Sequence, residues 1–381
     1  MKIKFRKNNN KTNDAKLHEM RFFAQIAERA GYTIAGVGTA FMMNGVSGLI
    51  SFGLIMLVFA SLQSQIISLW KLDLTNLSLR ISLAFRMTSF GLLSYGLISN
   101  NFSMMLIGAA FSGLFVGLFW PAFYHLKQES IGKWHLIEKI SGVILTITTG
   151  FLVIYWNTLY VLIISFTAST IGLILTFKIE NKEPSAVENI HEKNSDNGRL
   201  RFISILDGFN GETVRMIRRL AILSGAITIM NFDGILSFAL VLGISEALGA
   251  LIKQRTKFEI YEFSMIVVLG CLFCGILFNQ WVIGLIIIGI GNAGIFPVVH
   301  EYVRIRTNSD DINFRERNRF NGRIFGASFA AFIFVSSLNY TVVFVSVAFS
   351  TFIMWLIINF NKPSMPNLPS ELSPSIMKIT V

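Results

Sequence analysis

The stretch Gly-Leu-Phe-Val-Gly-Leu-Phe-Trp-Pro-Ala-Phe-Tyr-His, residues 113–125, ends an apolar run that begins near Met104. About half a chain length later, Gly-Asn-Ala-Gly-Ile-Phe-Pro-Val-Val-His-Glu, residues 291–301, ends a second apolar run with glycine, aromatic, proline and histidine in the same order. A basic hydrophilic loop follows each copy, and a glycine-containing apolar segment follows each loop. This repeat at half-chain spacing indicates an internal duplication of a membrane-embedded unit.

The composition is that of a polytopic membrane protein. Of the 381 residues, 53% are hydrophobic and only 14% are charged, so the chain carries more apolar surface than a soluble domain can cover. The chain has 30 glycines but only 7 prolines, which favours closely packed helices over a barrel of short alternating strands. We therefore expect an all-α membrane protein.

The chain is basic, with a formal net charge of +11, but the distribution of charge does not indicate a nucleic-acid partner. Lysine and arginine are spread over short loops beside apolar segments, which positive-inside topology explains. The only cysteines, Cys271 and Cys274, lie in an apolar run, so the sequence predicts neither a disulfide framework nor a metal site. The sequence contains no Walker loop or soluble nucleotide-binding domain, and we expect no cofactor.

Apolar segments recur in two sets of six, separated by short polar turns and longer charged stretches. In the first half we expect spans at residues 30–43, 46–69, 81–99, 103–124, 140–156 and 159–177, and in the second half at 220–230, 236–252, 263–278, 281–300, 324–338 and 342–359. The sequence thus predicts twelve transmembrane helices in two pseudo-symmetric six-helix bundles. The first span is unusually short, and if its helix instead begins near His18, Glu28 and Arg29 lie inside the membrane.

The predicted domain organisation follows from these spans. A cytoplasmic N-terminal tail with the approach to the first helix covers residues 1–29, and an N-terminal six-helix bundle covers 30–177. A charged cytoplasmic linker at 178–219 leads to a C-terminal bundle at 220–360, and residues 361–381 form a cytoplasmic tail.

Alternate turns differ in charge, and this difference predicts the topology. Six tight turns contain asparagine and no lysine or arginine; they lie near Asn44, Asn100, Asn157, Asn231, Asn279 and Asn339. Nearly all basic residues lie in the tails and in the other set of loops. Basic residues beside spans stay cytoplasmic, so we expect both termini and the linker inside the cell, in a multi-pass protein of the cytoplasmic membrane.

This architecture resembles the major facilitator superfamily of secondary transporters over roughly residues 20–360. The resemblance rests on two six-helix halves, a long cytoplasmic linker and longer inside loops. The glycine ladder of span four, with Gly108, Gly113, Gly117 and Pro121, fits the family, whereas the usual arginine of that span is missing. The loop at 69–80 keeps the acidic residue of the family signature and scattered basic residues but lacks the signature glycine.

The resemblance implies alternating access, in which two halves rock about a central site near the membrane midplane. It implies a small-molecule substrate, protons as the coupling ion and a lipid-embedded monomer that is not an enzyme. Small faces such as Gly113 with Gly117, and Gly322 with Gly326, are places where helices pack closely or where bundles meet.

Polar side chains at membrane depth are costly and are therefore candidate functional residues. Glu246 has apolar sequence on both sides and is a candidate for substrate or proton binding, with snorkelling to the surface as the alternative. Arg86 lies six residues into its span, deep enough to matter and shallow enough to snorkel. Glu28 is a further candidate, whose alternative is a simple interfacial position beside Arg29.

The residues of the repeated stretch add further candidates. His125 and His300 lie near the predicted inner surface, where a histidine that titrates near neutral pH would suit proton coupling or an inner gate, or would merely end a helix. Trp120 and Tyr124 are four residues apart and share a helix face, and Asn292 can line the same cavity. An aromatic cavity with few charges favours apolar or amphipathic cargo; interfacial anchoring is the alternative.

The leading hypothesis is a secondary transporter that is driven by protons and exports a small amphipathic molecule. An alternative is a membrane protein that has the same fold but acts as a sensor, immunity factor or assembly partner. An intramembrane enzyme using His125 or His300 is the least favoured hypothesis, because neither histidine has a second catalytic group near it in the sequence.

Overall fold

The computed structural model describes residues 15–70, 75–126, 133–179, 197–225, 234–256, 258–276, 281–306, 312–336 and 340–360. Helical residues begin at Ala15. The elements that follow are η1 (Ala27–Gly36), α2 (Val37–Leu69), α3 (Asn76–Ile98), α4 (Phe102–Leu126), α5 (Lys133–Tyr155), α6 (Thr158–Thr176), α7 (Asn197–Leu223), α8 (Gly234–Arg255), α9 (Ile260–Cys271), η2 (Leu272–Ile276), α10 (Trp281–Arg306), α11 (Ile312–Val335) and α12 (Thr341–Phe360). Regular structure in this part of the chain is entirely helical, which confirms the predicted fold class.

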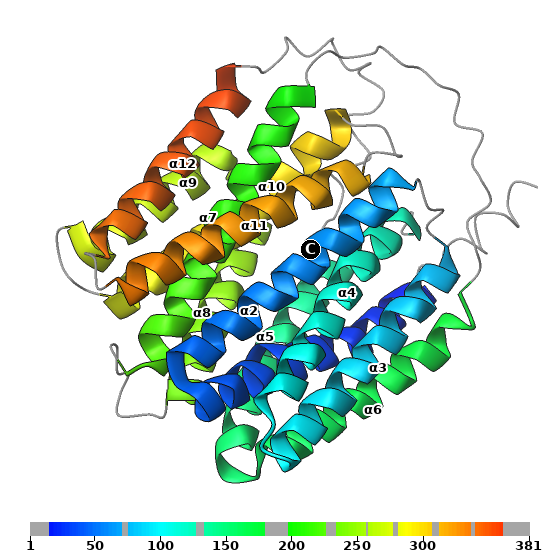
Figure 1. The fold of residues 1–381 in the computed structure, drawn as a ribbon. Helices are drawn as coiled ribbons and strands as arrows, with labels where there is room; N and C mark the ends of the chain where they lie inside the picture. Colours follow the sequence, from blue (N-terminus) through cyan, green and yellow to red (C-terminus); the bar gives the residue numbers. More distant parts are fainter. Residues whose placement is uncertain are drawn as a thin grey trace, which may run out of the picture.

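The helices form two groups that follow the order of the chain (Figure 1). In the N-terminal group α4 packs against α2 and α3, and α6 packs against α3; in the C-terminal group α7 packs against α11, and α9 packs against α10 and α12. The two groups meet where α11 runs beside α2 and where α5 runs beside α8. The fold therefore has two helical halves with a seam between them.

Six helical segments of the described residues are long and apolar enough to cross a membrane. They are 15–69, 76–98, 102–123, 158–176, 234–253 and 341–360, and shorter apolar helices lie at 140–155, 260–274 and 281–295. The segment at 15–69 contains a sharp turn, so it can cross twice. The count of twelve crossings remains a prediction.

The predicted asparagine turns are confirmed where the structure describes them. Inside α2 the helix breaks at Asn44 and Gly45, and Gly45 has a φ of 57°, in the left-handed region that glycine tolerates best. Asn100 has a φ of 50°, and the side chain of Asn157 accepts a hydrogen bond from the Leu159 backbone N–H at the start of α6. The turns expected at residues 231, 279 and 339 lie outside the described residues.

The first helix is longer than the sequence predicted. It is helical from Ala15, which agrees with the alternative of a helix that begins near His18, and Glu28 and Arg29 lie well inside this helix. Leu17, Met20 and Ala24 recur at helical spacing and are buried. Polar residues between them reduce the average hydropathy, because this helix is apolar on one face only.

Two further helices begin inside stretches that were expected to be hydrophilic. α7 begins at Asn197 and ends at Leu223, so the second part of the linker expected at 178–219 is helical. The span expected at 220–230 starts within the end of this helix, and residues 226–230 lie outside the described residues. α11 begins at Ile312, within the expected basic loop. Charged residues of these helices bind one another, so they are buried despite their low hydropathy.

Glycine pairs allow helices within each half to approach closely. A Cβ atom at Gly113 or Gly117 of α4 would clash with the α2 backbone, at the carbonyls of Met56 and Ala60. Similarly, Gly322 and Gly326 of α11 face backbone carbonyls of α7. These pairs therefore hold helices together inside a half and do not form the seam between the halves.

We predict that Gly117→Ala destabilises the protein, since the added Cβ would lie 2.5 Å from the Ala60 carbonyl oxygen. Forcing a methyl group into such a contact typically costs about 1–3 kcal/mol. Thermal unfolding of the purified protein in detergent measures the effect. Gly91→Ala in α3 is the matched control, because nothing lies within 4 Å of its added Cβ, and it should leave the midpoint unchanged or slightly higher.

Candidate functional site

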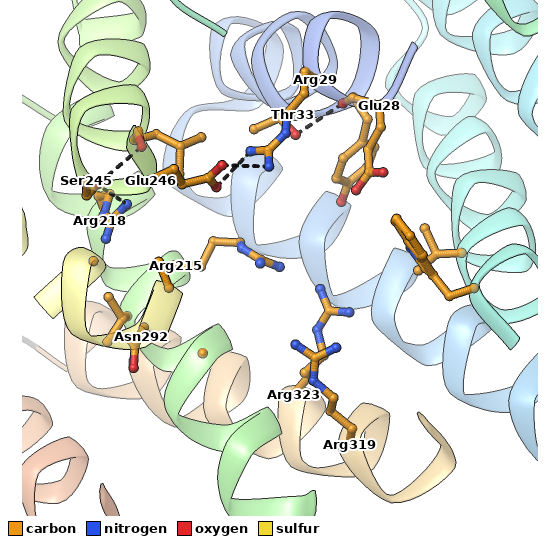
Figure 2. Close-up of a pocket in the computed structure, with 18 of the residues that line it drawn as sticks. Glu28, Arg29, Thr33, Arg215, Arg218, Ser245, Glu246, Asn292, Arg319 and Arg323 are labelled. Carbon is orange, nitrogen blue, oxygen red and sulfur yellow. Dashed lines mark hydrogen bonds and ion pairs between the residues drawn. The ribbon is translucent and has the colours of Figure 1, made fainter. Parts of the chain in front are cut away.

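A cavity of about 320 Å³ lies between the two halves (Figure 2). The first helix, α3 and α4 contribute to its wall from the N-terminal half, and α7, α8, α10, α11 and α12 contribute from the C-terminal half. This volume is within the range of small-molecule sites, which are commonly found between packed domains.

The wall of this cavity is rich in charge. Among its described residues are eight arginines, namely Arg21, Arg29, Arg86, Arg215, Arg218, Arg219, Arg319 and Arg323. Four acidic residues, Glu28, Asp207, Glu246 and Glu316, also line it. The arginines therefore exceed the acids by four. The expectation of a cavity with few charges, suited to amphipathic cargo, is wrong for these residues.

Helical spacing explains why so many of these arginines meet. Arg215, Arg218 and Arg219 are three and four residues apart in α7 and therefore project on one side of it. Arg319 and Arg323 are four residues apart in α11, which packs along α7. Figure 2 shows arginines of both helices extending toward the same space.

Glu212 of α7 compensates several of these arginines. Its Oε2 accepts hydrogen bonds from Arg215 Nη1 at 2.7 Å and from Arg323 Nε at 3.0 Å, and Arg219 Nη1 lies 3.8 Å from its Oε1. The Glu212 side chain is only 1% exposed. An acid buried among cations in this way is stabilised by them and joins α7 to α11.

Asp207 and Glu316 form a second compensating group between the same two helices. Arg319 Nε lies 2.9 Å from Asp207 Oδ2, and Arg315 Nη2 lies 3.8 Å from the same oxygen. Glu316 Oε1 accepts a hydrogen bond from Arg315 Nη1 at 3.3 Å. Together with Glu212, these acids explain how charged α7 and α11 can form part of a membrane protein's interior.

One ion pair crosses from one half to the other. Arg29 of the first helix donates two hydrogen bonds to Glu246 of α8, at 2.8 Å to Oε1 and 2.7 Å to Oε2 (Figure 2). Both side chains are partly buried, at 18% and 21% exposure. This bidentate geometry is the strong form of an arginine–carboxylate contact, and it links the halves at the cavity wall.

Two other arginines of the wall have no acidic partner within ion-pair distance among the described residues. The side chain of Arg86 is 0% exposed; its Nη1 donates to Ser112 Oγ at 3.3 Å, and the guanidinium lies 4.4 Å from the Phe115 ring centre. Arg218 is 5% exposed and makes only long contacts, at 3.4 Å to Ser245 Oγ and 3.3 Å to the Leu285 carbonyl. The cavity wall thus contains buried cations without carboxylates.

The structure brings together five of the residues that the sequence singled out. Glu28, Arg86, Trp120, Glu246 and Asn292 all line the cavity. Snorkelling of Arg86 does not fit its complete burial, and Glu246 binds Arg29. The guanidinium of Arg21 lies 5.0 Å from the centre of the Trp120 ring. The functional roles assigned to these residues remain predictions.

Other candidates lie outside the described part of the structure. Tyr124 and His125 belong to the helical backbone of α4, and His300 belongs to α10, but the structure does not describe their side chains. The charged residues of α7 and α11 were missed because they lie in stretches read as linker and loop. Their signal was the spacing of the arginines three and four residues apart, with apolar Met216, Ile217 and Leu220 between or beside them.

Within the described residues, no group of three or more histidine, cysteine, aspartate or glutamate side chains is placed to hold a metal ion. Cys271 and Cys274 are buried free thiols. The cavity therefore offers guanidinium and carboxylate groups for binding, together with aromatic rings at its edge.

No protein-family model matches the chain, and no curated protein matches it. Solved structures do match it over nearly its whole length. The nucleoside transporter NupG aligns with a TM-score of 0.59 and 12% identity, covering 92% of this chain and 99% of that one. The fucose:proton symporter FucP of E. coli aligns with a TM-score of 0.58 and 12% identity, covering 92% and 98%.

The human organic anion transporter MFSD10 aligns with a TM-score of 0.65 and 11% identity, covering 91% of this chain and 99% of that one. Another FucP structure, described as a major facilitator superfamily transporter in the outward conformation, has a TM-score of 0.61. These likenesses confirm the predicted resemblance at the level of the fold: the chain has the fold of major facilitator superfamily transporters.

We predict energetic coupling across the seam between Arg29 and Glu246. Arg29→Gln and Glu246→Gln should each lower the unfolding midpoint, because each removes the charge-assisted hydrogen bonds of a partly buried ion pair. The double variant should be destabilised by less than the sum of the two single-variant effects, with an interaction energy of about 0.5–3 kcal/mol. Thermal unfolding of the four proteins in detergent gives this value.

Arg201→Gln combined with Glu246→Gln is the matched control, because Arg201 is exposed near the start of α7. These two changes should be additive. Additivity of Arg29→Gln with Glu246→Gln would contradict the ion pair.

Proposed function

We propose that this chain is a secondary transporter that moves a small charged or strongly polar molecule across the cytoplasmic membrane by alternating access. The observation that carries the proposal is a charged cavity walled by both halves of a transporter fold. Intramembrane ionisable residues that face such a cavity commonly mark a solute pathway. Both termini lie on the cytoplasmic side in this proposal, as the basic loops favour.

The contacts between the halves suit a seam that can open and close. Ser61 of α2 donates a hydrogen bond to Asn321 Oδ1 of α11 at 2.9 Å, and Arg317 Nη1 donates to Ser68 Oγ at 3.0 Å. Side-chain contacts of this kind can break and re-form when two rigid bundles tilt. Helix packing inside each half, by contrast, depends on backbone contact at glycines and resists such movement.

The chemistry of the wall changes the expected cargo from amphipathic to charged. Aromatic residues such as Trp120 and Phe119 lie in the wall, but so do twice as many arginines as acids. An apolar solute would leave these charges without solvent or a counter-ion, which is unfavourable at low dielectric constant. A polar or charged solute would make contacts with these side chains in place of those made by the water that it displaces.

Glu28 is the residue that we propose for proton coupling. It lines the cavity, and Figure 2 shows it pointing away from the Arg29–Glu246 pair. In the described part of the chain, no lysine or arginine nitrogen lies within ion-pair distance of its carboxylate, unlike the carboxylates of Glu212 and Glu246. An acidic residue that lines a solute cavity without an ion-pair partner among the described residues is therefore our candidate for proton coupling.

We expect protein-dependent solute uptake into proteoliposomes, tested with labelled phosphate, citrate, uridine and fucose. Ser61→Cys combined with Asn321→Cys should allow a short thiol cross-link between α2 and α11. The cross-link should abolish uptake, and reduction or cleavage of the linker should restore it, because tilting of the halves requires this contact to open.

Each single cysteine variant is the control, treated with the same reagent, and should retain uptake. Full uptake by the cross-linked protein would contradict alternating access along this seam. A protein that moves no member of the panel would favour the non-transporting alternative, a sensor or assembly factor with the same fold.

We predict that Glu28→Gln separates solute exchange from proton coupling. The variant should still exchange labelled for unlabelled solute across the vesicle membrane but should lose uphill uptake driven by a pH gradient. Uptake and exchange measured on the same vesicles give this comparison. Glu19→Gln is the matched control, because Glu19 is an exposed acid on the same helix, and it should behave as the unmodified protein. Gradient-driven uptake by Glu28→Gln would refute this role.

A further inference from the structure

We infer that the solute bound in this cavity is a small anion with at least two negative charges, such as a phosphate or a polycarboxylate. The inference deepens the proposed function by naming the class of solute. It is carried by the charge balance of the wall and by two buried arginines, Arg86 and Arg218, that have no acid within ion-pair distance among the described residues.

The arginines of the cavity wall outnumber its acids. Eight arginines and four acids line it. Glu212 and Arg315 lie just behind and bind wall residues, and including both leaves the excess at four. Among the described residues, the acids of the site are therefore outnumbered by its arginines. A cation would be repelled by this excess, and a neutral solute would leave it uncompensated.

Arg86 is the clearest unsatisfied group. Its Nε and Nη2 atoms are buried without a hydrogen-bond partner, and its surroundings are largely aromatic, with Phe115 and Phe90 ring centres at 4.4 and 5.0 Å from the guanidinium. Aromatic rings attract a cation but do not neutralise its charge. Burial of an unpaired guanidinium is costly, so an anion in the cavity would gain much of its binding energy here.

Arg218 supplies a second cation from the opposite half. Its Nε is buried without a partner, and its other contacts are neutral oxygens at 3.3 and 3.4 Å. Figure 2 shows it beside Ser245. Because Arg86 belongs to α3 and Arg218 to α7, the two halves each contribute an arginine to the same cavity. An anion with two or more charges matches this arrangement.

Arginine is well suited to such a solute. The planar guanidinium binds carboxylate and phosphate oxygens in a bidentate manner, and it stays charged throughout the physiological pH range. The Arg29–Glu246 pair shows this geometry inside the same cavity, with a protein carboxylate in the role of the anion.

The test uses the purified full-length protein in an uncharged detergent. Sodium phosphate and sodium citrate are titrated while the thermal unfolding midpoint is measured, with sodium chloride at equal ionic strength and with glucose as comparisons. We expect a saturable rise with phosphate or citrate that chloride and glucose do not produce, because a ligand that binds only the folded state stabilises it. No rise with either multivalent anion would overturn the inference.

Variants locate the binding site. Arg86→Gln and Arg218→Gln should each weaken the apparent anion affinity at least tenfold, whereas Arg86→Lys and Arg218→Lys should retain part of it. Arg201→Gln, at an exposed position of α7, should bind as the unmodified protein does. Undiminished affinity in both glutamine variants would refute the assignment to these arginines.

Stability without ligand separates binding from a packing role. If Arg86 is held for anion binding, Arg86→Gln removes a buried charge that has no acid within ion-pair distance among the described residues, and the anion-free protein should unfold at a higher temperature than the unmodified protein. If Arg86→Gln instead unfolds at a lower temperature than the unmodified protein, both with and without anion, Arg86 serves to pack against the aromatic rings. That result would overturn its role in anion binding.

The outcomes also distinguish this inference from the proposed function. Anion binding in detergent does not require movement of the halves. Anion binding without uptake into vesicles would therefore refute the transport proposal but support the anion site. Uptake of uridine or fucose by a protein that no multivalent anion stabilises would support the transport proposal and refute the anion site.

Discussion

Compensation of charge inside the protein is the constraint on which the rest of this structure depends. α7 and α11 place arginines on facing surfaces, and these helices can pack only because Glu212 and Asp207 lie between them. Glu212 accepts hydrogen bonds from arginines of both helices. It therefore holds the two helices at a fixed separation and also compensates their positive charge. Gly322 and Gly326 then allow the close backbone approach that these short ion pairs require.

The contacts inside the C-terminal half differ from the contacts across the seam. Inside the C-terminal half, glycine contacts and the Glu212 and Asp207 clusters act on the same pair of helices. Across the seam, the structure has single polar contacts, such as Ser61 with Asn321, and the Arg29–Glu246 pair. An exchange between two states is therefore expected at the seam and not within a half, because fewer strong contacts must break there.

Hydropathy and turn chemistry predicted the helical class and the turns at Asn44, Asn100 and Asn157, because a break between two apolar segments is a local signal. They misplaced the starts of the first helix, α7 and α11. A charged residue reduces average hydropathy whether it faces water or another charge, and only the fold decides which occurs. Glu246 was recognisable because apolar residues surround it in the chain, whereas Arg218 stands among other arginines and resembles a linker residue.

The excess of positive charge also bears on the energetics of a transport cycle. Each elementary charge that crosses a membrane potential of about 100 mV exchanges about 2.3 kcal/mol with the field. Under the proposed function, an empty cavity with excess arginines would feel this field when access changes sides, whereas a cavity neutralised by an anion would feel it much less. Binding and charge compensation would then be one event. The loaded halves could tilt at low electrical cost, and the membrane potential would act mainly on the return of the empty protein.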